Sequence, residues 1–130
     1  MTTELTLLAW TLALALVHIF AFDVARTGQY GVKWNTGARD AAMPPLSALA
    51  ERLRRAQDNL YETLPLFAAA VLILHAAGIS TALTVIGCQL YFWGRVAYLP
   101  LYAAGVPWLR SIVWLVSFAG LGMLLVALIA

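Results

Sequence analysis

Long apolar stretches constrain this chain more than any other feature of its sequence. Thr3–Phe22 is apolar except for Glu4 and His18, and the segment after Arg110 is almost entirely Leu, Val, Ile and Ala. Because about 20 apolar residues in a helix cross the hydrocarbon core of a bilayer, each stretch predicts a membrane-spanning helix. With 63% hydrophobic residues, the chain has room for about four spans and no separate soluble domain. We therefore expect an all-α integral membrane protein with a single domain, residues 1–130.

Four helices are predicted from the apolar stretches and from the residues that interrupt them. Their expected ranges are about 3–26, 46–78, 82–102 and 108–130. The only long connection is Thr27–Pro45, where three glycines and two adjacent prolines make a continuous helix implausible. A loop of this length is often functional, for example as a lid, and disorder is the competing interpretation.

Isolated polar residues within the apolar helices have local explanations. His18 is expected to be hydrogen-bonded inside the bundle, with a ligand or proton-relay role as the alternative. Asp23 and Arg26 lie at i and i+3 near the end of the first helix, where they are able to pair. Cys88 is the only cysteine, which excludes an intrachain disulfide, and its apolar neighbours favour a packing role.

The second helix begins with a strongly charged segment, ERLRRAQDNLYE. One face of it carries a polar stripe at i, i+3, i+7 and i+10, formed by Arg52, Arg55, Asn59 and Glu62. A charged side chain that faces lipid at mid-membrane costs about 2.5 to 3.5 kcal/mol. The stripe must therefore lie at a membrane surface, face other helices or bind a polar ligand. Asp58 lies outside the stripe, and Arg54 at i−4 is expected to neutralise it.

A second polar face occurs near the end of the third helix. Arg95, Tyr98 and Tyr102 lie at i, i+3 and i+7 and therefore share one side. After a short turn, Arg110 and Ser111 fall in the first turn of the last helix. These residues and the polar stripe are expected to meet at one end of the bundle.

The basic residues predict the orientation of the protein. All eight Lys and Arg lie in the first connection, the third connection or the adjoining helix ends. The positive-inside rule then places these connections in the cytoplasm and both termini outside, in the inner membrane if the protein is bacterial. The polar residues would thus gather at the cytoplasmic face.

The types of residue at this end exclude several kinds of chemistry. There is no Ser-His-Asp arrangement and no set of metal ligands, and both histidines are expected to lie far from the stripe. A net charge of +2 gives no case for nucleic-acid binding. An excess of cations beside an apolar wall suits a small anionic ligand that reacts with a lipid-soluble partner. The competing interpretation is that the arginines only snorkel to the membrane surface and the tyrosines only pack.

Two segments resemble the MAPEG family, the membrane-associated proteins in eicosanoid and glutathione metabolism. The family pattern, roughly E-R-x-x-R-A-x-x-N-x-x-E-x-x-P, is matched within one helix by Glu51, Arg52, Arg55, Ala56, Asn59, Glu62 and Pro65. The second segment, GRVAYLPLYAAGVPWLRS, follows at a compatible distance. The resemblance extends to the four-span plan of the whole chain and implies a four-helix bundle that assembles as a homotrimer.

The resemblance also implies a function and a set of site residues. Enzymatic members bind glutathione between neighbouring subunits near the cytoplasmic face, and lipophilic substrates enter from the bilayer. Arg110 matches the arginine credited with stabilising the thiolate, and Ser111 matches a neighbouring hydroxyl. The residues expected to contact glutathione are Arg52, Arg55, Asn59, Glu62, Arg95, Tyr98 and Tyr102, together with Arg26 at the end of the first helix. This implies a glutathione transferase or peroxidase acting on hydrophobic electrophiles or lipid hydroperoxides.

Some residues depart from the family pattern and leave the activity open. Tyr98 replaces the His of several glutathione-using members, the segment between it and Arg110 is a residue shorter than in some, and Asp58 stands where at least one member has a base. The family also includes a non-catalytic lipid-binding member, so a lipid-binding or scaffolding protein is the alternative. A small multidrug exporter is a weaker alternative, since it needs an acid embedded in the first helix, whereas Glu4 and Asp23 lie at its ends.

Overall fold

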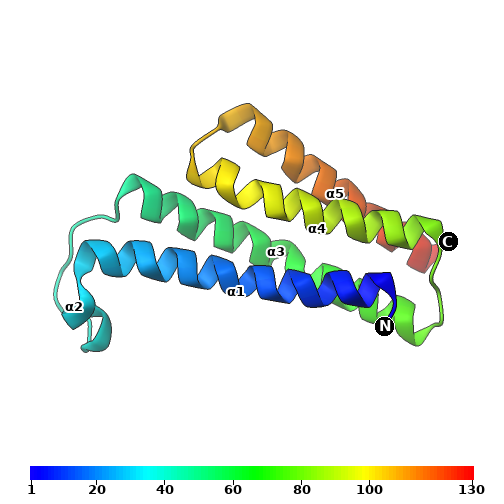
Figure 1. Ribbon diagram of the computed structural model, residues 1–130, viewed down its shortest axis with the longest axis horizontal. Helices are drawn as coiled ribbons and strands as arrows, with labels where there is room; N and C mark the ends of the chain where they lie inside the picture. Colours follow the sequence, from blue (N-terminus) through cyan, green and yellow to red (C-terminus); the bar gives the residue numbers. More distant parts are fainter.

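The computed structural model describes all residues from 1 to 130, and its regular structure is entirely helical. It contains four long helices and one short one. The long helices are α1 (Thr3–Tyr30), α3 (Ala48–Ala76), α4 (Ala82–Ala103) and α5 (Pro107–Ile129), and the short one is α2 (Val32–Thr36). Consecutive long helices run in opposite directions, so that both termini and the α3–α4 turn lie at one end (Figure 1). The α1–α3 and α4–α5 connections lie at the other end.

The helix ends differ from the predicted ranges by a few residues, and the largest difference is in α1. This helix continues four residues beyond the expected end at residue 26, because Gly28 stays helical and the break occurs only at Gly31, where φ is +96°. The expected long loop therefore holds the last turn of α1 and all of α2. The remainder is fastened to α1, since Gln29 Nε2 donates to Pro45 O and Tyr30 Oη donates to Pro44 O.

Side-chain caps define the beginning of three long helices. Thr2 and Ser47 accept hydrogen bonds from the first-turn amides of α1 and α3, and Thr81 forms a reciprocal capping box with Thr84 at the start of α4. Helix α5 begins at Pro107 without a side-chain cap. Its first-turn amides therefore keep their positive potential at the end of the molecule where the arginines lie.

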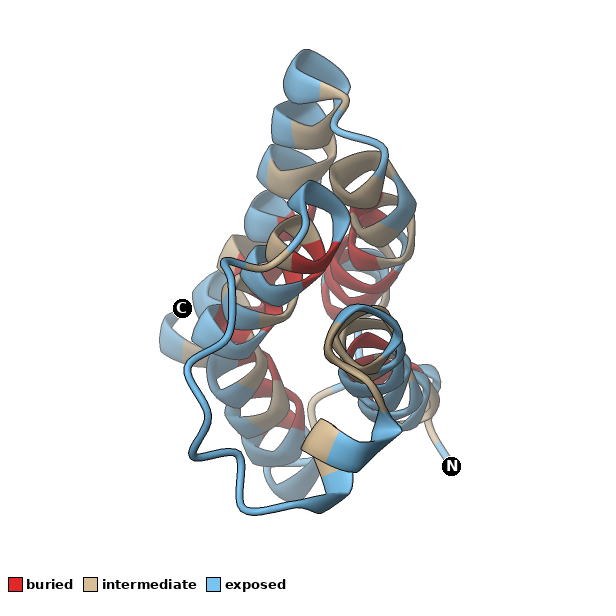
Figure 2. Ribbon diagram, turned by 90° about the vertical axis from the view of Figure 1, so that its left-hand side faces the viewer, coloured by how far each residue is buried: buried red, intermediate tan, exposed pale blue.

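The buried faces of the helices point toward one another, as a view along the helices shows (Figure 2). Helices α4 and α5 make the closest pair, because glycines remove the side chains between them. A Cβ atom added at Gly120 would lie 2.5 Å from the backbone oxygen of Gly87, and one at Gly94 would lie 2.8 Å from Ser117 Cβ. Cys88 is fully buried in the apolar core, which confirms its predicted packing role.

Three helices, α1, α3 and α5, are long and apolar enough to cross a membrane. Many large apolar side chains on them are exposed in the single chain, including Leu16, Leu72 and Leu115 at 54%, 53% and 58%. Such faces suit lipid or another subunit. Helix α4 has 22 residues but carries Gln89, Arg95 and several tyrosines, and it falls outside this set. Its place as the fourth span stays a prediction.

Candidate functional site

A cavity of about 440 Å³ lies between α3, α4 and α5 at the end of the molecule that holds the α4–α5 connection. Its lining contains most of the polar residues singled out from the sequence. The residues are Arg55 and Asn59 from α3, Tyr98 and Tyr102 from α4, and Arg110, Ser111, Trp114 and Leu115 from α5. Two cations, an amide, three hydroxyl groups and an apolar wall therefore surround one space.

Two arginines of the cavity share the ring of Tyr102. The guanidinium carbon of Arg110 lies 4.6 Å from the ring centroid, and that of Arg55 lies 5.9 Å from it. Neither guanidinium forms an ion pair. The ion pairs of the chain are Asp23–Arg26 and Glu51–Arg54. The aromatic face holds both cations without neutralising their charge.

A smaller cavity of about 230 Å³ adjoins the first, and the two share Arg55, Tyr102 and Arg110. Arg52 lines only the smaller one, and its Nε donates a hydrogen bond of 2.9 Å to Ala103 O at the end of α4. Gly105, with φ +75°, turns the chain beside this arginine. Arg52 thus joins α3 to the α4–α5 turn and adds a third cation near the same space.

Arg95 lies beneath the main cavity rather than on its surface. It is 1% exposed, and its guanidinium lies 5.3 Å from the Tyr98 ring centroid and 5.7 Å from that of Tyr91. Its Nη1 donates to Asn59 Oδ1 at 2.6 Å, and its Nη2 donates to Thr63 Oγ1 at 2.9 Å. Every partner is neutral, and the Nε–H is buried without a partner, so hydrogen bonds and aromatic faces compensate the buried charge only in part.

The bond from Arg95 fixes the orientation of the Asn59 amide. A guanidinium only donates hydrogen bonds, so the oxygen of Asn59 must point toward it. The Nδ2 group is then the part of the amide left for the cavity. Asn59 therefore presents donors to the cavity, whose lining also carries the positive charges of Arg55 and Arg110. Arg95 acts as a positioning residue for this amide.

Beneath Arg95, a second polar contact joins α3 to α4. Thr63 Oγ1 and Tyr91 Oη lie 2.9 Å apart, and both residues are buried. The Tyr91 ring stacks on Phe67 with a centroid distance of 4.0 Å and an interplanar angle of 15°. Neither Thr63 nor Tyr91 was predicted from the sequence. Tyr91 lies four residues before Arg95 and therefore on the same face of α4, and this spacing is the sequence feature that would have placed it beside Arg95.

Trp114 is a further cavity residue that was not predicted from the sequence. Its Nε1–H is buried without a hydrogen-bond partner, and the residue lies at i+4 from Arg110 on the same face of α5. Ser111 has a local bond, since its Oγ donates to Pro107 O at 3.2 Å. The hydroxyl oxygen retains lone pairs, while the indole nitrogen offers an unused donor.

Two predicted ligand residues lie outside the cavity of their own chain. Glu62 is exposed on α3 and lies within electrostatic range of Arg95. Arg26 pairs with Asp23 at 2.7 Å, as predicted, and lies near the rings of Phe22 and Trp34. The structure therefore brings six of the ten predicted residues to the main cavity, places Arg52 and Arg95 beside it, and leaves Glu62 and Arg26 apart.

Two smaller predictions differ from the structure. Arg54 forms its ion pair with Glu51 at i−3, while Asp58 at i+4 lies only within electrostatic range of its guanidinium. His18 is buried, as expected, but neither ring nitrogen has a hydrogen-bond partner. It also lies within electrostatic range of Arg95.

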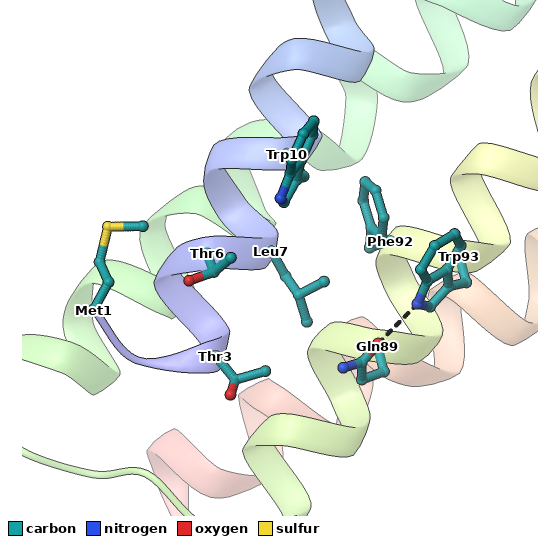
Figure 3. A pocket seen from close by; sticks show the side chains of 8 residues that line it. All are labelled: Met1, Thr3, Thr6, Leu7, Trp10, Gln89, Phe92 and Trp93. Atoms are coloured by element: carbon teal, nitrogen blue, oxygen red, sulfur yellow. Dashed lines mark hydrogen bonds between the residues drawn. The ribbon is translucent and has the colours of Figure 1, made fainter.

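A separate cavity of about 490 Å³ lies between α1 and α4 toward the opposite end (Figure 3). The Trp10 indole of α1 faces the Phe92 and Trp93 rings of α4 across it, and Trp93 Nε1 donates to Gln89 Oε1 at 2.8 Å. Its lining contains no Arg or Lys side chain. It suits an apolar occupant and does not supply the charge found in the cavity between α3, α4 and α5.

These features define an integral membrane protein of helices with a cationic cavity at one end. The chain belongs to the MAPEG family, whose family model matches residues 7–130, essentially the whole length. Comparisons with curated proteins and with solved structures found no match. The resemblance first drawn from two segments is thus confirmed over nearly the entire chain.

Proposed function

We propose that this protein is a membrane-bound glutathione transferase or peroxidase, acting on hydrophobic electrophiles or lipid hydroperoxides. Membership of the MAPEG family fits a glutathione- or eicosanoid-type activity. The observation that carries the proposal is the placement of Arg55 and Arg110 near one cavity-lining ring, that of Tyr102, with no carboxylate paired to either. Such a pair attracts an anion of small size, and the tripeptide glutathione carries two carboxylates and a thiol.

The charge of Arg110 alone would be enough to lower the pKa of the glutathione thiol and so produce the thiolate nucleophile. A free thiol with a pKa of about 8.5 is only a few per cent ionised at neutral pH. Lowering that pKa by two units needs about 2.7 kcal/mol of preferential stabilisation of the thiolate. A guanidinium about 4 Å away supplies roughly 4 kcal/mol at an effective dielectric constant of 20, before desolvation. The uncapped first turn of α5 adds positive potential in the same place.

The remaining residues of the cavity would hold and orient the peptide. Arg55 and the Nδ2 group of Asn59 offer donors to its carboxylates, and the exposed Glu62 offers an acceptor to its amino group. Tyr98 and Tyr102 form a wall with a ring-centroid distance of 5.4 Å. Arg110 and Ser111 lie together at the end of the first turn of α5, where the sulfur would sit. A thiolate held there attacks the electrophile and forms a carbon–sulfur bond as the leaving group departs.

The lipophilic partner would approach along α5. Leu115 lines the cavity and is 58% exposed, and Ile112 beside it is also exposed. The apolar wall therefore continues from the cationic space to the outer surface of the helix. A substrate dissolved in the bilayer would reach the sulfur without crossing water.

We further propose that the protein works as a homotrimer with this end of the helices at the cytoplasmic face and both termini outside. The basic residues gather at this end. Glu62 and Arg26 lie apart from the cavity of their own chain, and long apolar faces are exposed. In a trimer, these groups would contribute to a glutathione site that lies between subunits.

The decisive experiment measures thiolate absorbance in the ultraviolet as glutathione is added to the purified protein in detergent. Wild type should show a thiolate signal with release of a proton, and Arg110→Ala should show neither. Arg39→Ala is the matched control, because Arg39 is an exposed arginine on the α1–α3 connection. Light scattering should give the same trimer mass for all three proteins, which separates loss of chemistry from loss of assembly.

A full thiolate signal in Arg110→Ala would refute the assigned role of this arginine. If wild type also gives no signal with any thiol, the transferase proposal fails. The alternative is then a non-enzymatic lipid-binding or scaffolding member of the family, in which the cationic cavity holds an anionic lipid. Binding of an anionic lipid that depends on Arg55 and Arg110 would support that alternative.

A further inference from the structure

The end of the molecule opposite to the cationic cavity contains a buried carboxylate that the proposed function does not use. Glu4 lies in the first turn of α1 and is 4% exposed. Its Oε1 accepts a hydrogen bond of 2.8 Å from Ser80 Oγ and one of 2.6 Å from Thr84 Oγ1. Its Oε2 is buried and has no partner. One half of the carboxylate is thus fully satisfied and the other half is left without a donor.

A cavity of about 220 Å³ adjoins this carboxylate near the α3–α4 turn. Its polar lining consists of Thr2, Glu4, His75 and Ser80, and its apolar lining comes from Val71, Leu74, Gly78 and Ile79. The space exceeds what one water molecule needs. An unpaired carboxylate oxygen in such a place is costly unless a donor or a cation meets it.

We propose that this cavity binds the primary ammonium group of an amine or of a membrane lipid. An ammonium carries three N–H donors. Glu4 Oε2 is free to accept one of them, and the hydroxyl oxygens of Thr2 and Ser80 have lone pairs for the others. The aliphatic side chains of the lining then cover the carbon atoms attached to the nitrogen.

The residues that line the cavity favour a primary ammonium over a quaternary ammonium or a divalent metal ion. A quaternary ammonium has no N–H group and is usually held by aromatic rings, and the cavity contains no Phe, Tyr or Trp. A divalent metal ion needs several strong ligands, and the chain has no group of three His, Cys, Asp or Glu side chains that would hold one. The site is separate from the proposed glutathione site and does not depend on it.

The source of the ammonium is tested in two arms with the full-length protein. In the first, calorimetry in phosphatidylcholine nanodiscs compares n-hexylammonium with 1-hexanol and with hexyltrimethylammonium. In the second, native mass spectrometry counts phosphatidylethanolamine and phosphatidylcholine retained after extraction from vesicles of equal composition. Each arm uses wild type, Glu4→Gln, and Asp40→Asn as the control, because Asp40 is an exposed acid on the α1–α3 connection.

Wild type and Asp40→Asn should bind hexylammonium more tightly than either comparison compound, and Glu4→Gln should weaken it about 10- to 100-fold, the effect of losing one hydrogen bond to a charged group. Selective retention of phosphatidylethanolamine that is lost in Glu4→Gln identifies a lipid headgroup as the source. Hexylammonium binding without such retention identifies free amines. Either result supports the site.

The proposal is overturned if Glu4→Gln leaves both arms unchanged, or if neither ammonium source binds selectively to wild type. A further variant, His75→Ala, is measured in both arms. The proposal is also overturned if ammonium binding appears only in this variant, because His75 would then be the natural partner of Glu4. If Glu4→Gln does not fold, Ile79→Phe provides the test. That variant keeps the carboxylate and fills part of the cavity, so it should abolish ammonium binding.

Discussion

The buried contact between Thr63 and Tyr91 gives the sharpest stability prediction. Thr63 Oγ1 accepts from Arg95 Nη2 and shares a second hydrogen bond with Tyr91 Oη, both at 2.9 Å. Thr63→Val keeps the shape and volume of the side chain almost unchanged and removes only the hydroxyl. The substitution leaves the Tyr91 hydroxyl and one guanidinium N–H pair without a partner in a buried place.

Two measured ranges bound the expected loss in the free energy of unfolding. An unpaired buried group costs about 1 to 3 kcal/mol in water-soluble proteins. Hydrogen bonds between membrane helices average about 0.6 kcal/mol in measured cycles, with a maximum of about 1.7. Because one of the two donors here is charged, we expect a value at the upper end of the membrane range. The predicted loss in the free energy of unfolding is therefore about 1 to 2 kcal/mol.

The assay is unfolding in mixed micelles with increasing dodecyl sulfate, followed by circular dichroism. Thr11→Val is the matched control, since Thr11 is also fully buried but its Oγ donates only to Leu7 O in its own helix, at 2.7 Å. That bond competes with the helix ladder and stabilises no contact between helices, so its loss should cost close to zero. A cycle with Tyr91→Phe should give a coupling of about 1 kcal/mol. Equal losses for Thr63→Val and Thr11→Val, or a coupling near zero, would refute this account.

Two further predictions concern packing and the cavity. Gly120→Ala should destabilise the protein by about 1 to 3 kcal/mol in the same unfolding assay, because the new Cβ would lie 2.5 Å from Gly87 O. Gly122→Ala is the control, since a Cβ at Gly122 meets open space and the substitution should be neutral or stabilising. Similar losses for both variants would contradict the close approach of α4 and α5. Asn59→Leu should raise the Kd for glutathione about tenfold in calorimetry, because the substitution removes the Nδ2 donor from the cavity. Gln57→Leu is the control, because Gln57 lies on the same helix outside the cavity, and its Kd should not change. An unchanged Kd for Asn59→Leu would remove this amide from the proposed site.

The sequence predicted the residues of the cavity best where helix periodicity alone decides their position. Arg55 and Asn59 share a face because they are four residues apart, and Tyr98 and Tyr102 do so for the same reason. The structure places all four in the lining of one cavity. Arg110 was expected at the same end of the bundle because it follows the short turn after the third helix, and the family resemblance added only its role. Its position next to α3 and α4 depends on how α5 packs and is not contained in any local pattern.

Partners within the bundle were predicted less well, because they depend on which faces of distant helices meet. From the sequence, Glu4 was placed at the end of the first helix, with no buried partner predicted. In the structure it is buried and accepts hydrogen bonds from Ser80 and Thr84, more than seventy residues away in the chain. His18 was expected to find a hydrogen bond and has none. No spacing along α1 reveals either outcome, since both are set by the packing of α1 against α3 and α4.

The two arginines Arg95 and Arg110 show why one guanidinium is structural and the other is available for chemistry. Arg95 is buried, and two of its nitrogens are used by Asn59 and Thr63, so its charge is already engaged with neutral partners. Arg110 lies on the cavity wall with its guanidinium 4.6 Å from the centroid of the Tyr102 ring, and it has no ion pair. A ligand anion would therefore gain more from Arg110 than from Arg95. The same end of the molecule thus provides one fixed cation that orients the Asn59 amide and one unpaired cation on the cavity wall.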